Sequence, residues 1–340
     1  MASTLHDVAR LAGVSIKTVS NVINDYPHIR PATREKVEQA IAETGYRPNR
    51  AARLLRSGRT GLISLVMPDL RNVYFAELAD DVMTAAAAHG LSVLIEQIRA
   101  DQGPAGELEV VEAAIQRGVD GVLYSVLALR DEDVAELRRA PVPLVLLGER
   151  IFGGPTDHVT MQNVEAARAA TEHLIERGST RIAALGAHEG EVIGSAGLRL
   201  RGYREALEAA GLPFDERLVP PGGTWFRSDG ARLMRQILDS GVEFDAVFAF
   251  NDAVALGAMR VLQEAGLRVP HDVRIIGFDD LDETRYTMPT LSTIDPGRRL
   301  IAETAVEFLV ERINAGEGGP APREVEVPFR VVERESTAIG

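Results

Sequence analysis

The stretch Thr4–Asn24, TLHDVARLAGVSIKTVSNVIN, predicts two short helices joined by a tight turn. Thr4 is a candidate N-cap, and Asp7 three residues later completes a pattern that resembles a capping box. Gly13 supplies the turn, because glycine adopts backbone angles that other residues avoid. Ser15 can cap the second helix.

Each of these helices has an apolar side and a polar side. The apolar residues recur at helical spacing and are Leu5, Val8, Ala9, Leu11, Ala12, Val19, Val22 and Ile23. The other side of the second helix carries Ile16, Lys17, Ser20 and Asn21. This is the design of a helix-turn-helix, whose second helix lies in the major groove of DNA. An ordinary helical hairpin with a solvated polar face would show the same pattern.

The next segments complete a small head and lead out of it. A third helix is predicted from an N-cap at Thr33 to Thr44, with Val37, Ala40 and Ile41 on its core side. Residues 49–60, NRAARLLRSGRT, could be a linker or a short helix. Nearby phosphates best explain its cations Arg50, Arg53 and Arg56. Leu54 and Leu55 need a partner, which a second subunit or a DNA base step would provide.

Charge is divided unevenly along the chain. Residues 1–60 hold 10 Lys and Arg against 5 Asp and Glu, a net of +5, whereas residues 61–340 hold 27 against 45, a net of −18. A basic head on an acidic body suits phosphate contact by the head alone. The chain has no cysteine, no apolar run of membrane-spanning length and a polar N-terminus. We therefore expect a cytoplasmic protein, nucleoid-associated when bound to DNA.

From Leu62 onward, apolar runs of strand length alternate with helical segments in two series. The expected strands are LISLVM, LSVLI, GVLYS and VPLVLL in the first series, and RIAAL, DAVFAF and VRIIGF in the second. The expected helices are 73–89, 105–118, 132–139, 164–178, 197–210, 228–240, 252–265 and 297–314. We predict two doubly wound subdomains between which the chain crosses near 159–163 and near 290–295. The tail helix should return to the first subdomain, and the strands in EVEVPFRVVERES should finish near the second.

Enzyme signatures are missing from the sequence, which contains no GxGxxG, P-loop, HExxH or GxSxG motif. Ligands of open α/β sheets sit at the carboxyl ends of strands. Residues that follow expected strands are Tyr74, Phe75, Glu149, Arg150, Asn251, Asp252, Asp279 and Asp280. Arg199 lies on the approach to the helix at 200–210, and Trp225, the only tryptophan, is in a Gly-rich loop. Carboxylates, an arginine and aromatic faces suit a polyhydroxyl ligand or a flat heterocycle. Asn251 and Asp279 could equally be helix or turn caps.

The head and the segment that follows it, TREKVEQAIAETGYRPNRAARLLRSGRTGLI, resemble LacI/GalR-type transcriptional regulators. The resemblance continues in VYFAEL, LRLRGYREAL, AVFAFNDAVALGAMRVLQEAGLRVPHDVRIIGFDD, PTLSTI and REVEVPFRVVERES. It implies a helix-turn-helix head and an α/β effector domain of two subdomains like those of periplasmic binding proteins. The implied domains are 1–48 (head), 49–60 (hinge helix) and 61–340 (effector binding and dimerisation). Within the last, 61–161 with 291–323 would form the N-subdomain, and 162–290 with 324–340 the C-subdomain.

The resemblance also implies a repressor that binds a near-palindromic operator as a homodimer under control of a small effector. The implied DNA-binding residues are Thr4, Leu5, His6, Ser15, Ile16, Lys17, Thr18, Ser20, Asn21, Asn24, Thr33, Tyr46, Asn49, Ala52 and Leu55. The residues that match effector-cleft positions are Tyr74, Phe75, Glu149, Arg199, Trp225, Asn251 and Asp279, although Glu149 stands where many members have Asp. The effector would be a sugar or related metabolite, alternatively a nucleobase, with no cofactor and no metal. A solute-binding protein would share the two-lobed body but would need a signal peptide and no basic head.

Overall fold

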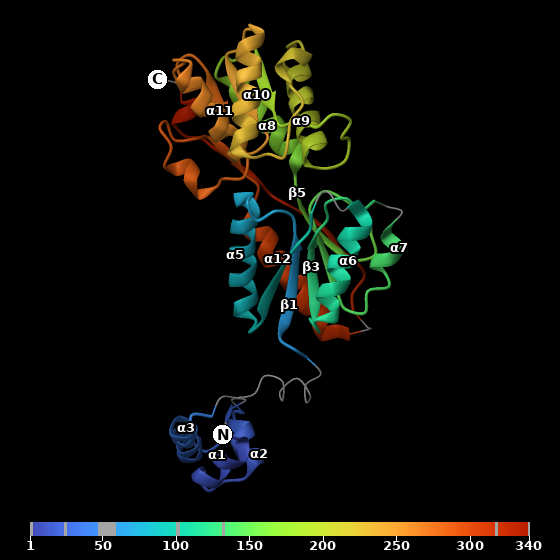
Figure 1. Ribbon diagram of the computed structural model, residues 1–340, viewed down its shortest axis with the longest axis vertical. Coiled ribbons are helices and arrows are strands. Elements are labelled where there is room, and N and C mark those ends of the chain that lie inside the picture. Colours follow the sequence, from blue (N-terminus) through green and yellow to red (C-terminus); the bar gives the residue numbers. More distant parts are fainter. Residues whose placement is uncertain are drawn as a thin grey trace. The chain divides into compact units, whose positions relative to one another are not determined.

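The computed structural model of the chain describes residues 3–23, 26–46, 59–99, 103–130, 133–316 and 319–338. The chain divides into two compact units, Met1–Thr60 and Gly61–Gly340 (Figure 1). No helix in the described ranges is long and apolar enough to cross a membrane.

The smaller unit, the head, contains the helices α1 (Leu5–Ala12), α2 (Ile16–Ile23) and α3 (Pro31–Thr44). The predicted capping box is confirmed, because the Thr4 hydroxyl accepts from the Asp7 amide and the Asp7 carboxylate accepts from the Thr4 amide. Gly13 ends α1 with a φ of 66°, and the Ser15 hydroxyl accepts the Thr18 amide at 3.1 Å. The core of the head is formed by Val8, Ala9, Val19, Val22, Val37 and Ala40.

Two predictions about the head are wrong. Helix α3 begins at Pro31 after Arg30, so Thr33 lies inside the first turn and is not the N-cap. Proline suits this position because its fixed φ matches the helix and its missing N–H would be unbonded there anyway. Leu11 is 51 % exposed, because the core side of α1 is centred on Val8 and Ala9.

The larger unit contains two lobes, and the first is built on a parallel six-stranded sheet in the order β10-β5-β4-β3-β1-β2. Its strands are β1 (Leu62–Met67), β2 (Ser92–Gln97), β3 (Gly121–Ser125), β4 (Leu144–Leu147), β5 (Asp157–Met161) and β10 (Glu324–Val327). Its helices are α5 (Val73–Ala88), α6 (Gly103–Gln116), α7 (Val134–Leu137) and α12 (Arg298–Ala315). Helices α5 and α12 pack together on one face of the sheet (Figure 1).

The second lobe has a parallel three-stranded sheet in the order β6-β7-β8. The strands are β6 (Ile182–Leu185), β7 (Ala246–Ala249) and β8 (Arg274–Ile276). Its helices are α8 (Asn163–Glu176), α9 (Ser195–Ala209), α10 (Arg227–Ser240) and α11 (Asp252–Glu264), which pack as the pairs α8 with α9 and α10 with α11 (Figure 1). The predicted alternation of strands and helices is thus confirmed in both lobes.

The C-terminal strands depart from the prediction. Strand β10 pairs with β5 in the first sheet, so the expectation that residues from 324 onward finish near the second lobe is wrong for this strand. The reason is a buried carboxylate: Asp157 on β5 accepts hydrogen bonds from Arg312 and Arg323, which draws the chain before β10 to that edge. Strand β11 (Arg330–Val332) then pairs antiparallel with β9 (Thr293–Asp295).

The chain therefore passes between the lobes three times. The connections follow β5, β9 and β10 and lead to α8, α12 and β11 respectively. Arg330 and Asp295 form an ion pair of 2.9 Å where two of these connections lie antiparallel. The sequence predicted all three crossings, but it placed the third before residue 324, whereas the structure places it after β10.

Candidate functional site

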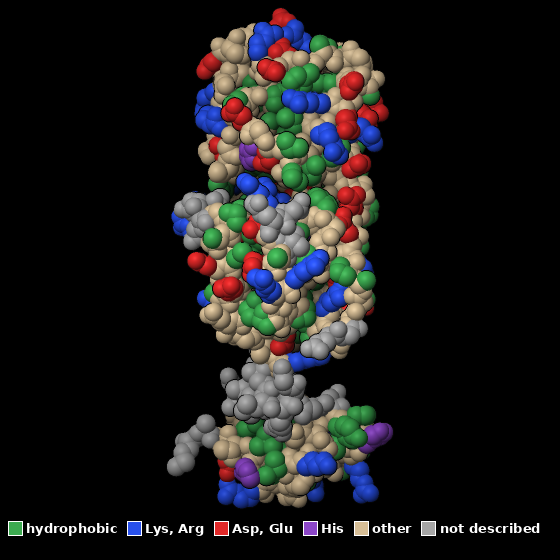
Figure 2. Space-filling model, turned by 90° about the vertical axis from the view of Figure 1, so that its right-hand side faces the viewer, with side chains coloured by type: hydrophobic (Ala, Val, Ile, Leu, Met, Phe, Trp, Pro, Cys, Tyr) green, Lys and Arg blue, Asp and Glu red, His purple; other side chains and the backbone are tan. Residues whose placement is uncertain are grey.

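A cavity of about 570 Å³ is lined by residues of both lobes, at the carboxyl ends of β1, β3, β4 and β6. Figure 2 shows one face of the molecule, on which a recess opens between the two halves of the larger unit. Six of the seven predicted effector residues line the cavity, namely Tyr74, Phe75, Glu149, Arg199, Trp225 and Asp279. Its volume is within the range of small-molecule sites.

Arg199 is the central cation of this cavity. It lies on α9, and only 2 % of its surface is exposed. Its guanidinium donates to the Asn163 side-chain oxygen at 2.8 Å and to the Phe250 carbonyl, and it lies 3.5 Å from the centre of the Phe278 ring. Burial lowers the pKa of Arg199, while the nearby Asp279 and Glu149 carboxylates partly oppose that shift.

Asp279 faces Arg199 with 4.0 Å between a carboxylate oxygen and a guanidinium nitrogen. Burial raises the pKa of Asp279 to about 7, because the attraction of Arg199 and Arg298 offsets only part of the desolvation. The carboxyl group is therefore poised between a hydrogen-bond donor and an acceptor near neutral pH.

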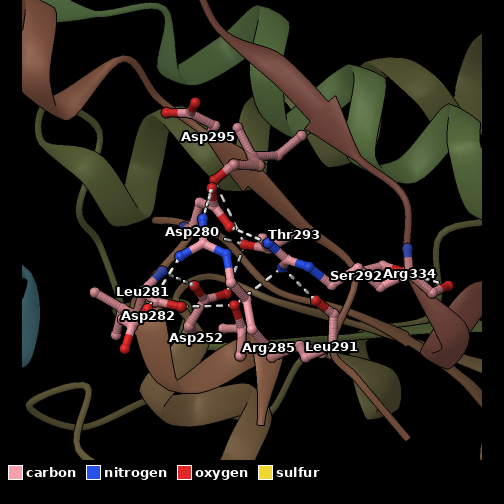
Figure 3. Close-up of polar contacts among 12 residues, drawn as sticks. Asp252, Asp280, Leu281, Asp282, Arg285, Leu291, Ser292, Thr293, Asp295 and Arg334 are labelled. Atoms are coloured by element: carbon pink, nitrogen blue, oxygen red, sulfur yellow. Dashed lines mark hydrogen bonds and ion pairs between the residues drawn. The ribbon is translucent and has the colours of Figure 1, made fainter. Parts of the chain in front are cut away.

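The loop after β8 has an unusual backbone geometry at Asp279 and Asp280, and polar contacts surround Asp280 (Figure 3). Both residues have positive φ, 121° and 50°. The Asp252 carboxylate accepts from the Leu281 amide at 2.9 Å and from the Thr293 hydroxyl at 2.6 Å, and Asp280 forms ion pairs with Arg285 and Arg334. These bonds fix the loop that presents Asp279 to the cavity.

Aromatic rings form another part of the wall. Trp225 is half-buried and donates from its indole nitrogen to the Gly186 carbonyl at 2.7 Å, which leaves a ring in the lining. The rings of Tyr74 and Phe75 meet edge to face at 5.3 Å. Burial raises the pKa of Tyr74, so its phenol stays protonated.

Asn251 does not line the cavity, which departs from the expected role in ligand binding. It is the N-cap of α11, where its side-chain oxygen accepts the Val254 amide at 2.8 Å. Its amide nitrogen donates to the Trp225 carbonyl at 3.1 Å. Asn251 is thus a helix cap, which is one of the two roles that the sequence allowed. It also holds the segment that contains Trp225.

The structure adds site residues that the sequence reasoning missed. Asn163 and Ser195 both donate to the Glu149 carboxylate at 2.9 Å. His188 places its two ring nitrogens 2.7 Å from the Glu191 carboxylate and from the Gly223 carbonyl. Both partners are acceptors, so this geometry suits the imidazolium, and the bond to Glu191 raises the pKa of His188. His188 follows β6, so the strand-end rule could have found it.

The predicted DNA-contacting residues of the head are largely accessible. Thr4, His6, Ser15, Ile16 and Lys17 are exposed. Thr18, Ser20, Asn21 and Thr33 are half-buried, and Leu5 and Tyr46 pack partly against the head core. The predicted contacts Asn24, Asn49, Ala52 and Leu55 lie outside the described residues, as do Arg50, Arg53, Leu54 and Arg56.

Comparison with known proteins matches both units. Residues 4–49 match the model for bacterial regulatory proteins of the lacI family, and residues 171–337 match a periplasmic binding protein-like domain. The HTH-type transcriptional regulator CelR of Thermobifida fusca is 38 % identical over 335 residues, which cover 97 % of each chain. The chain belongs to the LacI family.

Solved structures agree with this assignment. A putative LacI-family regulator from Sanguibacter keddieii is 50 % identical, with a TM-score of 0.75 over 82 % of this chain and 99 % of that one. A CelR–cellobiose complex has 34 % identity and a TM-score of 0.71, covering 98 % and 99 % of the chains. The lac repressor dimer bound to operator and the anti-inducer ONPF has 30 % identity and a TM-score of 0.81, covering both chains fully.

Membership of this family establishes the class of function. The chain is a sequence-specific DNA-binding transcriptional regulator controlled by a small-molecule effector, and its relatives are regulators, not enzymes. The basic head and the two-lobed body described above are the two parts that this function requires.

The raised pKa of Asp279 predicts a pH-dependent stability. Between its ordinary value of 3.8 and about 7, the folded chain holds a proton that the unfolded chain releases. The free energy of unfolding should therefore fall as pH rises through this window, by on the order of 1.4 kcal/mol per pH unit from this group, and level off above it. In Asp279→Asn this part of the slope should vanish in urea unfolding of the effector-free protein. An identical pH slope in both proteins would contradict it.

Proposed function

We propose that the cavity between the lobes binds the effector, and that the effector is a sugar or related polyhydroxyl metabolite. The observation that carries this proposal is the buried Arg199–Asp279 pair beside the Trp225 ring. Charged groups that are buried make strong hydrogen bonds to hydroxyl groups, and an indole ring packs against the apolar face of a sugar. The cellobiose in the CelR complex is consistent with this chemistry.

A nucleobase is the second candidate, because Trp225, Tyr74 and Phe75 offer aromatic surfaces to a flat ring. Arg199 and Asp279 could bond ring nitrogens and carbonyls as readily as hydroxyls. The proposed effector residues for either ligand are Tyr74, Phe75, Glu149, Arg199, Trp225 and Asp279. Asn251 supports this set through the Trp225 carbonyl instead of joining it.

We propose that the protein is a repressor in which the head, residues 1–48, and the segment 49–60 bind a near-palindromic operator as a homodimer in the cytoplasm. The proposed DNA-contacting residues are Thr4, Leu5, His6, Ser15, Ile16, Lys17, Thr18, Ser20, Asn21, Asn24, Thr33, Tyr46, Asn49, Ala52 and Leu55. The exposure of Ile16 and Lys17 at the start of α2 supports this assignment, since such positions meet base edges in helix-turn-helix proteins. Within 61–340, β10 joins the N-subdomain in this proposal.

Lys17 should contribute to base recognition. Lys17→Ala should lose about 1–3 kcal/mol of discrimination at one operator position, because a base-edge donor is removed. The matched control Lys36→Ala makes the same charge change on the exposed side of α3 and should leave base preference unchanged. Binding of an operator library with all single substitutions measures both. A wild-type preference profile in Lys17→Ala would contradict the assignment.

The cavity assignment is tested by the emission of Trp225, the only tryptophan. A panel of sugars and nucleobases is screened by fluorescence, and hits are confirmed by calorimetry. The true effector should change the emission, and Asp279→Ala should weaken its binding while leaving effector-free operator binding nearly intact. Asp282→Ala, on the same loop but 68 % exposed, is the control. An effector that binds Asp279→Ala as it binds the wild type would place the site elsewhere.

A further inference from the structure

Glu149 forms hydrogen bonds to residues of the opposite lobe. It follows β4 of the first lobe, whereas its two partners begin helices of the second lobe. One carboxylate oxygen accepts from the Asn163 amide nitrogen at 2.9 Å, and the other accepts from the Ser195 hydroxyl at 2.9 Å. Both acceptor oxygens of Glu149 are thus bonded to the opposite lobe.

The orientation of Asn163 ties this contact to the central arginine. Its side-chain oxygen accepts from Arg199 Nε at 2.8 Å, so its amide nitrogen must point at an acceptor, which is Glu149. Asn163 is only 3 % exposed. Without Glu149 its amide nitrogen would lose its partner in a buried place, which carries a free-energy penalty.

We propose that Glu149, Asn163 and Ser195 form a clasp that links the two lobes beside the cavity. This inference rests on the proposed function of the cavity as the effector site. Glu149 occupies the Ser195 hydroxyl, which lines the cavity and which an acceptor group of the effector, such as a hydroxyl, would otherwise engage. Binding of the effector then exchanges an internal bond for a ligand bond, and the clasp sets how far the lobes separate without ligand.

The length of the side chain decides whether the clasp closes. Aspartate is one methylene shorter and could not keep both 2.9 Å bonds from the same backbone position. Glu149 is thus the residue that gives this chain a direct link where a shorter acid would leave a gap for ligand or water. Arg71 of the first lobe also lies 5.2 Å from the Phe226 ring centre of the second, a weaker contact at the cavity wall.

The clasp is tested in the effector-free full-length protein by acrylamide quenching of Trp225, which lines the cavity from the second lobe. Loss of the charge-assisted bonds in Glu149→Ala should raise the ratio of open to closed lobes on the order of tenfold, and quenching should rise with it. Glu149→Asp and Ser195→Ala should shift quenching in the same direction by less.

A double-mutant cycle separates the clasp from a general loosening. The effects of Glu149→Ala and Ser195→Ala should be less than additive, because each removes the same bond. The control is Glu136→Ala, which removes an exposed acid that pairs with Arg139 within the first lobe and does not line the cavity, and its Trp225 emission should be quenched as in the wild type. Circular dichroism and melting curves confirm that each variant is folded.

The outcomes distinguish the clasp from the proposed function. Wild-type quenching in a folded Glu149→Ala, or fully additive effects in the cycle, would overturn the clasp. Small-angle X-ray scattering should show an increased radius of gyration for Glu149→Ala, and an unchanged radius would likewise overturn it. Because neither measurement uses an effector, failure of every sugar and nucleobase to bind would overturn the cavity assignment while these results still decide the clasp.

Discussion

The larger unit depends on one constraint, the need to satisfy a guanidinium that is almost wholly removed from water. Arg199 is 2 % exposed, and a buried cation is tolerated only when hydrogen bonds and opposite charge surround it. The Phe250 carbonyl, the Asn163 side chain and Asp279 provide these partners from three segments of the chain. Their common dependence on Arg199 brings the end of β7, the start of α8 and the loop after β8 to one place.

This requirement connects chemistry at the cavity to the arrangement of the lobes. Asn163 follows the first of the three connections between the lobes, and Glu149 reaches it from the first sheet. A ligand that bonds to Arg199 or Asp279 therefore acts on residues whose positions depend on how the lobes meet. Such coupling allows a small molecule to favour one lobe arrangement over another.

Sequence patterns predicted the local structure well, because the caps and apolar runs that determine it lie in neighbouring residues. The capping box at Thr4 and the buried apolar run Leu62–Met67 of β1 need no distant partner to be recognised. Strand β5 was seen only as a pause between the two series, because its polar residues Asp157 and Thr160 do not resemble a buried strand. Asp157 is buried by Arg312 and Arg323, which lie more than 150 residues away.

The candidate site shows the same limit. Sequence reasoning predicted six residues that line the cavity, but the strand-end rule could not distinguish Asn251, whose neighbours make it a helix cap. Asn163 and Ser195 were not predicted as site residues, because their role depends on hydrogen bonds to Glu149 of the other lobe. Contacts between lobes depend on tertiary geometry that periodicity and spacing do not encode.

The account is tested most directly by measuring the linkage between its two binding sites. Operator affinity is measured with and without saturating effector, and effector affinity with and without operator, at one salt concentration. We expect both affinities to change by the same factor, about 5- to 150-fold, because linkage is reciprocal. An effector that binds in the cavity, as Trp225 emission and Asp279→Ala define it, yet leaves operator affinity unchanged would contradict the account.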